Sequence, residues 1–162
     1  MSDRDNGDEA AILGRNAPTE EVGDLLERAE FGILGLARGD ESYAVPLSFG
    51  YEDDLSALYF MLAFEPDSKK REFIRATETA SFVVAESDLP DSWGSIFFTG
   101  TLSPVPDGEI EDAYAALAAH AAFPASYTFA EYIESYDIEQ VLYEFDVEEV
   151  TARQSNPEQL GE

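Results

Sequence analysis

The residues best suited to chemistry in this chain are basic side chains gathered within seven positions. Lys69, Lys70, Arg71 and Arg75 are four of only nine lysines and arginines, against 35 acidic residues and a net charge of −26. They follow Ser68 at the expected start of a helix, where cations oppose the helix dipole. A bound anion would resolve that conflict, because backbone N–H groups, the dipole and the two lysines would all face it. The pattern predicts a phosphate-binding site at residues 68–71.

A plainer interpretation of the cluster stays open. The cations could form a solvated helix face, with an i, i+3 pair such as Lys69 and Glu72. Against this, the chain uses lysine nowhere else, and the point charge of lysine suits a phosphate group. A single histidine, His120, cannot form a metal triad. No carboxylate pair stands out among so many, so neither a catalytic residue nor a metal site is predicted.

Composition limits the class of protein. At 162 residues with 44% hydrophobic and 12% aromatic residues, the chain is expected to form one domain with a substantial core. Abundant acid and scarce lysine are typical of a halophilic protein, whose self-repulsion concentrated salt would screen. The charge excludes nucleic acid and anionic membranes as general partners. With no cysteine, no signal peptide and no apolar run of membrane-spanning length, a cytoplasmic protein is expected.

Hydrophobic periodicity predicts six strands and three helices. The strands are expected at 31–37, 42–51, 57–63, 81–85, 95–102 and 140–150, and the helices from 19 to about 29, from the basic cluster to about 77, and at 107–122. Residues 123–137 are aromatic and fit neither pattern. Several strands with one internal crossover helix indicate a mostly β, α+β fold, a mainly antiparallel barrel with peripheral helices. A flexible acidic N-terminus (1–17), one domain (18–152) and a C-terminal tail (153–162) are expected.

Pro46 interrupts an apolar run in the second expected strand. Proline cannot donate a hydrogen bond to a neighbouring strand. An edge strand, a bulge or a place where a ligand meets the backbone would each explain its position.

Six segments taken in order resemble a known family. They are 44–51, 58–63, Ser68-Lys69-Lys70, 72–76, 80–84 and 93–101. This succession is similar to the pyridoxamine 5′-phosphate oxidase-like family of flavin-binding split β-barrels, over residues 19–151. The resemblance implies a split barrel of about six strands, with flavin mononucleotide (FMN) at a homodimer interface.

The resemblance also implies which residues bind the cofactor. Lys69 and Lys70 would hold the phosphate beside Ser68, and Trp93 would lie near the ring. The isoalloxazine ring would lie along the strand that contains Pro46, Leu47, Ser48 and Phe49. Leu62 and Ala63 would lie beside the ring, and the strand of Ser95 would approach it from below.

The resemblance leaves the reaction open. Residues 151–157 lack the Arg/Trp signature of true pyridoxamine phosphate oxidases, so vitamin B6 synthesis is not expected. Met61 stands where some relatives have a histidine. The first hypothesis is an oxidoreductase that moves electrons between NAD(P)H and a small acceptor, with the cofactor carrying the chemistry. The alternatives are a non-catalytic flavin-binding protein, acting as store, carrier or sensor, and a reductase that uses a deazaflavin.

Overall fold

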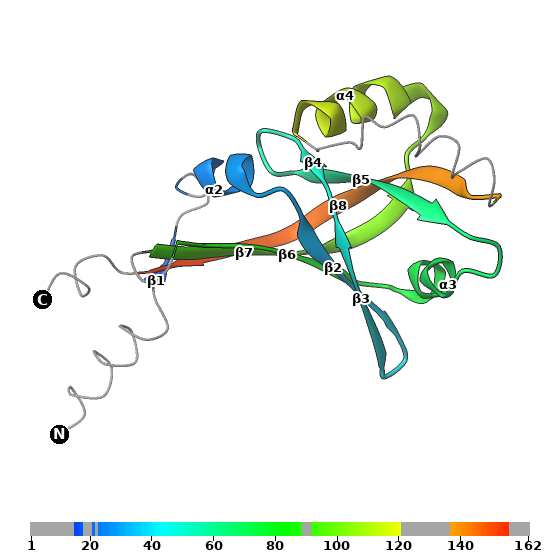
Figure 1. Cartoon of the computed structure of the whole chain (residues 1–162), viewed down its shortest axis with the longest axis horizontal. Coiled ribbons are helices and arrows are strands. Elements are labelled where there is room, and N and C mark those ends of the chain that lie inside the picture. Colours follow the sequence, from blue (N-terminus) through cyan, green and yellow to red (C-terminus); the bar gives the residue numbers. More distant parts are fainter. Residues whose placement is uncertain (1–14, 18–20, 22, 89–91, 121–136, 156–162) are drawn as a thin grey trace, which may run out of the picture.

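The computed structural model describes residues 15–17, 21, 23–88, 92–120 and 137–155 (Figure 1). In chain order the elements are β1 (Arg15–Asn16), α2 (Gly23–Arg28), β2 (Gly32–Arg38), β3 (Glu41–Leu47), β4 (Gly50–Tyr51), β5 (Ala57–Phe64), α3 (Lys69–Ala76), β6 (Ala80–Asp88), β7 (Ser92–Pro104), the 3-10 helix η2 (Asp107–Glu109), α4 (Ile110–His120) and β8 (Glu139–Gln154).

The strands form a single antiparallel sheet in the order β3-β2-β6-β7-β8-β5-β4, with β1 paired to β8. Its two edge strands, β3 and β4, are joined by Ser48 and Phe49 alone. Three peptide steps span at most about 11 Å. The sheet therefore curls until its edges almost meet at this end.

At the other end the sheet stays open, and α3 occupies the gap between β3 and β5. The Phe73 ring of α3 stacks on Tyr43 of β3 with centroids 5.2 Å apart. On the other side of the helix, Lys70 reaches the end of β5, where its ammonium donates to the Ala63 carbonyl. Figure 1 shows the β2–β3 hairpin diverging from β5, with α3 at that end of the molecule. This opening, called the split below, makes the fold a split barrel.

Alternation along the strands fills the barrel with aromatic and aliphatic side chains. On β2 and β6, the inward residues Leu34, Phe82 and Val84 are fully buried, whereas their sequence neighbours face outward. Seven phenylalanines are almost completely buried: Phe49, Phe60, Phe64, Phe73, Phe82, Phe98 and Phe145. Burial of this apolar area is the main stabilising term for the fold.

Helix α4 covers the outside of β5 and β8 and builds a second, smaller core. Leu117 of the helix packs there with Tyr59 and Leu142. Close approach requires a glycine, because a Cβ added at Gly50 would lie 2.6 Å from the backbone nitrogen of Leu117. A side chain at this position would push the helix off the sheet.

The expected fold class is confirmed, as a mainly antiparallel split barrel with peripheral helices. One expected strand was wrong in detail: residues 42–51 form β3 and β4, interrupted at Ser48 and Phe49, because there the chain passes from one edge of the sheet to the other. Pro46 lies on an edge strand, since β3 pairs only with β2. The ambiguous stretch at 123–136 lies outside the described residues. None of the described helices is long and apolar enough to span a membrane.

Candidate functional site

The site begins where the chain turns from β5 into α3. Asp67 adopts a left-handed conformation with φ 62°, which aspartate tolerates better than most residues. Ser68 then caps the helix, and its hydroxyl accepts a hydrogen bond of 3.4 Å from the amide of Arg71. The first turn of the helix directs its remaining amides out of the N-terminus. Sequence and local geometry thus agree on where this helix starts.

The two lysines diverge from this turn towards opposite edges of the split. The Lys70 ammonium donates a 2.9 Å hydrogen bond to the carbonyl of Ala63 on β5. The Lys69 ammonium lies 5.6 Å from the ring centroids of Tyr43 on β3 and Phe73 on α3. The α3 N-terminus therefore presents one cation to each side of the opening, and Ser68, Lys69, Lys70 and Ala63 come together as expected.

Burial destabilises the charged form of Lys70. Its side chain is half-buried over the Phe64 ring. Burial lowers the pKa of Lys70, and the nearby carboxylate of Glu65 only partly opposes that effect. A bound phosphate would favour the protonated form of this lysine. Lys69, by contrast, is exposed.

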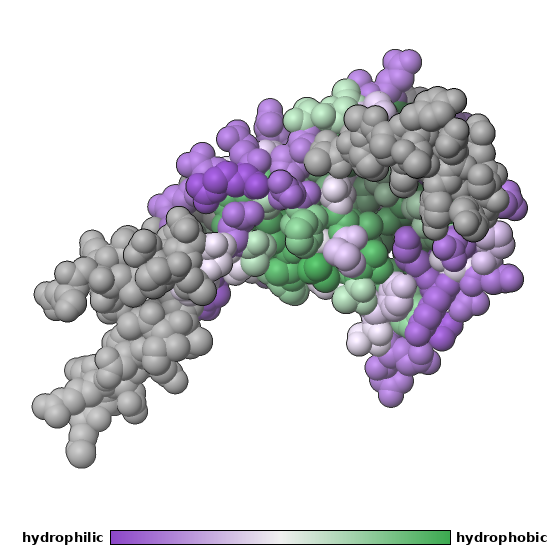
Figure 2. Space-filling model, viewed as in Figure 1, coloured by the Kyte–Doolittle hydropathy of each residue, from purple (hydrophilic) through white to green (hydrophobic). Residues whose placement is uncertain are grey.

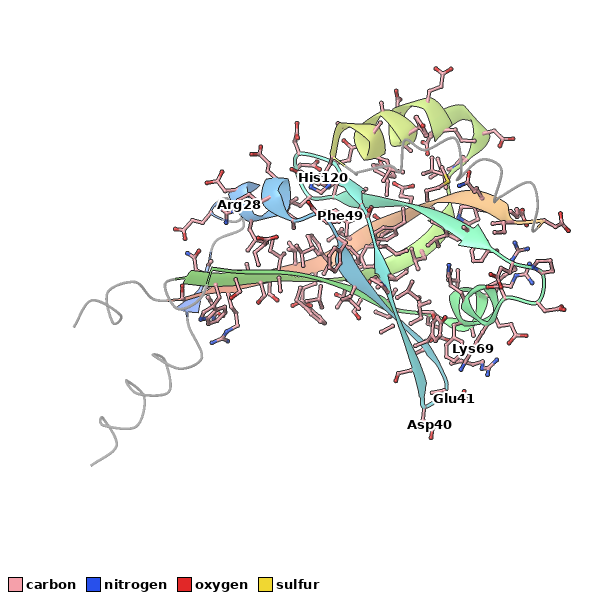
Figure 3. All side chains as sticks on the ribbon, viewed as in Figure 1. Arg28, Asp40, Glu41, Phe49, Lys69 and His120 are labelled. Atoms are coloured by element: carbon pink, nitrogen blue, oxygen red, sulfur yellow. The ribbon has the colours of Figure 1, made fainter. Side chains whose placement is uncertain are left out.

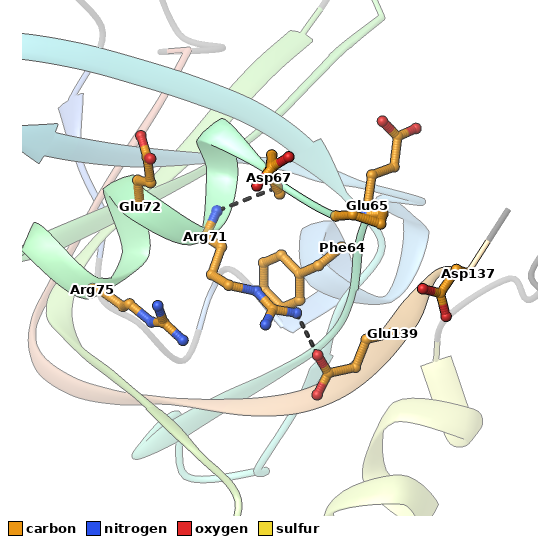
Figure 4. A pocket seen from close by; sticks show the side chains of 10 residues that line it. Phe64, Glu65, Asp67, Arg71, Glu72, Arg75, Asp137 and Glu139 are labelled. Carbon is orange, nitrogen blue, oxygen red and sulfur yellow. Dashed lines mark hydrogen bonds and ion pairs between the residues drawn. The ribbon is translucent and has the colours of Figure 1, made fainter.

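Arg71 and Arg75 face a different environment from the lysines (Figure 4). Both line a cavity of about 400 Å³ beside the helix, together with the carboxylates of Glu65, Asp67, Glu72, Asp137 and Glu139. Arg71 lies over Phe64 and forms a 2.5 Å ion pair with Glu139. Because its lining residues carry five carboxylates and only two guanidinium groups, this cavity does not favour a phosphate. Lys69 and Lys70 do not line this cavity, so a phosphate contact within residues 68–71 stays a prediction for the two lysines.

The plainer interpretation of the cluster fails in one respect. Glu72 pairs with Arg38 at 3.3 Å, across the gap between α3 and the β2–β3 hairpin. It therefore ties the helix to the barrel instead of neutralising Lys69. The Thr77 hydroxyl strengthens the same junction, since it accepts a hydrogen bond from the Ala37 amide and donates its single proton to the Phe73 carbonyl, 2.6 Å away.

The residues expected along the ring lie mostly on the β3 edge, but their side chains point in different directions. Pro46 and Ser48 are exposed. Leu47 packs partly against the barrel core, and Phe49 is 0% exposed. Leu62 on β5 is likewise 0% exposed. Phe49 and Leu62 could therefore meet a ligand only through their backbones.

Trp93 and Ser95 lie far from the lysines within one chain. Strand register places β7 three strands away from β3, about 14 Å along the curved sheet. It also places Ser95 five residues, or about 17 Å, from the level of Tyr43. A single chain does not bring these two residues to the split.

An uncharged apolar row separates the two groups on the outer face of the sheet. Directly paired residues of an antiparallel sheet share a face, and one such row crosses five strands. Phe31, just before β2, is 57% exposed, and within the row Ile33 and Phe97 are 39% and 45% exposed. In Figure 2, apolar surface gathers over the middle of the molecule, between polar regions at α2 and at the β2–β3 hairpin tip. The row, called the apolar row below, consists of Pro46, Ile33, Val83, Phe97 and Thr151.

Sequence reasoning missed the residues that hold the basic turn in place. Tyr43, Arg38 and Thr77 reach α3 from other elements, so no spacing in the sequence links them to it. Their only signal was local: Tyr43 is an aromatic residue at an inward position of an expected strand.

A family model described as pyridoxamine 5′-phosphate oxidase matches residues 18–154. The match covers most of the chain, and the chain belongs to this family. No match was found among curated proteins.

Solved structures share the fold at low sequence identity. A FAD-binding protein from Mesorhizobium loti is 23% identical with a TM-score of 0.64, covering 89% of this chain and 99% of its own. The FAD-binding protein of Mycobacterium smegmatis is 15% identical with a TM-score of 0.64, covering 88% and 98%. A FAD- and haem-binding protein of the same organism is 14% identical with a TM-score of 0.60, covering 86% and 72%.

Proposed function

We propose that this protein binds FMN in the split and works as an oxidoreductase that passes electrons between a nicotinamide and a small acceptor. The observation that carries the proposal is the divergence of Lys69 and Lys70 from the start of α3 to the two edges of the split. A phosphate placed there would meet two ammonium groups and the amides of a helix N-terminus. The flavin-binding names of structural relatives support the same cofactor class.

The cofactor site is completed by a second copy of the chain. The exposed edge at Pro46 and Ser48 offers backbone to one face of a flat ring but nothing to cover the other. The apolar row would be buried in a two-fold interface, which uses the same patch on both chains. Trp93 and Ser95, remote from the lysines within one chain, would then be contributed by the second protomer. Of the neighbouring residues Phe97 and Phe98, Phe98 is fully buried, so only Phe97 offers surface to such an interface.

The flavin itself would supply the electron transfer when bound. The residues of this chain would hold the phosphate through Lys69 and Lys70, support the ring along β3, and exclude water at the interface. Among the described residues, the lysines are the only titratable groups placed on the proposed contacts, so a non-catalytic flavin-binding role is the second candidate.

Titration of the purified protein in molar KCl tests the proposal. We expect quenching of the fluorescence of Trp93, the only tryptophan, and a yellow protein after FMN is added. Fluorescence that ignores FMN would refute the cofactor assignment, and tight binding of a deazaflavin instead would redirect it. Rapid bleaching of the bound flavin by NADH or NADPH supports the oxidoreductase, whereas an unbleached flavin supports the non-catalytic role.

A further inference from the structure

His120, the only histidine of the chain, ends α4 with each ring nitrogen against a backbone carbonyl. Nδ1 lies 2.6 Å from the carbonyl oxygen of Phe49, in the link between β3 and β4. Nε2 lies 2.6 Å from the carbonyl oxygen of Leu26 in α2. Figure 3 shows His120 beside Phe49 near α2. One side chain thus joins three segments of the fold.

The chemistry of these contacts specifies the protonation state. A carbonyl oxygen accepts hydrogen bonds and cannot donate them, so each ring nitrogen must be a donor. A neutral imidazole has a single N–H, and its other nitrogen would direct a lone pair at a carbonyl oxygen. Only the imidazolium satisfies both contacts. We propose that His120 is a proton-dependent clamp, which holds α4 to α2 and to the β3–β4 link while it is protonated and releases one of them when it is not.

The surroundings of the ring favour the cation. His120 is the last residue of α4, where the helix dipole attracts positive charge. Its ring lies 4.5 Å from the Phe49 ring and 5.2 Å from the Tyr51 ring, both between centroids, within the distance at which aromatic groups attract a cation. The charges on α4, Glu111 and Asp112, stand in its first turn, and residues 115–119 before the ring are alanine and leucine only.

Charged groups on the neighbouring elements surround Tyr51, which contacts the ring. Glu27 on α2 and Asp53 after β4 both lie close enough to Tyr51 to raise its pKa, after the larger effect of burial. The phenol therefore stays neutral beside the ring across the range in which histidine titrates. The other charged residues of α2, Asp24 and Arg28, are exposed.

The clamp acts where the barrel nearly closes. Its Phe49 contact fixes the two-residue link between the edge strands, next to Gly50, on which α4 packs. Loss of the proton would weaken this junction, so a stabilising contribution present at low pH should disappear as the pH rises. Both carbonyl contacts of His120 lie within the folded chain and need no bound flavin.

Nuclear magnetic resonance of the imidazole nitrogens tests the protonation state directly, because every histidine signal belongs to His120. At about pH 7.5 an unconstrained histidine is mostly neutral. We expect both ring nitrogens of the native protein, in molar KCl, to carry protons at this pH. A neutral tautomer, with one protonated and one bare nitrogen, would overturn the proposal.

A His120→Gln variant tests the consequence for stability, since glutamine keeps one donor but cannot titrate. The ratio of unfolding constants, variant over native, should be about tenfold larger at about pH 6 than at about pH 9, because only the imidazolium makes the extra charge-assisted bond. Ala115→Gln, at an exposed site of the same helix, should show no such pH dependence. An equal ratio at both pH values refutes the clamp. If His120→Gln does not fold, the nitrogen spectrum of the native protein decides.

Discussion

Replacing Lys70 by methionine should weaken FMN binding far more than riboflavin binding. Methionine keeps an apolar stem over Phe64 and removes the ammonium. A hydrogen bond between charged groups contributes about 1.5–3 kcal/mol, which corresponds to roughly a 10- to 150-fold loss of FMN affinity. Riboflavin lacks the phosphate, so its affinity should change little. The Lys69→Met change should cost less, up to about 1 kcal/mol, because Lys69 is exposed.

Fluorescence titrations with both flavins in molar KCl measure these ratios. Arg75→Gln is the matched control: it removes a cation from the same helix, but from the carboxylate-lined cavity. The pKa of Lys70 is lowered by burial, so the preference for FMN over riboflavin should shrink as the pH rises towards the titration of this lysine. Equal losses for the two flavins, or a loss with Arg75→Gln as large as with Lys70→Met, would refute a phosphate contact at Lys70.

Three further predictions concern stability and assembly. The melting temperature should climb as KCl rises from about 0.1 M to above 1 M, because screening relieves repulsion among the 35 acidic residues; a flat profile contradicts the halophilic interpretation. Burial raises the pKa of Glu144, and the carboxylates of Glu109, Asp146 and Glu52 raise it further. The fold therefore favours the neutral side chain, and the ionised carboxylate destabilises it as the pH rises. Glu144→Gln should raise the melting temperature at neutral pH and change it little near pH 4, whereas the control Glu148→Gln should not show this difference between the two pH values. Light scattering in molar KCl should give a dimer that Phe97→Glu reduces to the monomer mass of 17.8 kDa, and a flavin-loaded native monomer would refute the interface.

The fold could be predicted because its signals are local. Alternation of apolar residues marked most strands within a few positions, and Ser68 and Thr77 bracketed α3 as expected. The same local signals mislead at residues 42–51, where the apolar pattern continues although the chain changes partners at Ser48 and Phe49. The interruption at Ser48 and Phe49 is set by which strands pair in the sheet, and the order of side chains along the sequence does not show it.

The site could be predicted only in part, for a similar reason. Lys69 and Lys70 are the only lysines of the chain, and this identified the start of α3 as the candidate site. The directions in which the side chains point could not be predicted. Lys69 and Lys70 reach the two edges of the split, whereas Arg71 pairs with Glu139, 68 residues away in the sequence. His120 was set aside as a ligand because it is alone, yet its role depends on two carbonyl groups, which every residue has and no motif displays.

The charge distribution sets an unusual salt dependence for the proposed cofactor site. Ordinary lysine–phosphate contacts weaken as salt is added, but here a surface of net charge −26 repels an approaching dianion over the whole protein. The Debye length falls from about 10 Å at 0.1 M salt to about 3 Å at 1 M, so salt removes that distant repulsion first. The contact with the half-buried Lys70 is short and screened least. FMN should therefore bind more tightly at about 1 M than at about 0.1 M KCl. Riboflavin carries no phosphate, so its own gain in affinity over this range measures only the effect of salt on folding and assembly. The gain for FMN should be larger than the gain for riboflavin. A fall in FMN affinity over this range, with riboflavin unchanged, would show that the lysines act as ordinary surface charges.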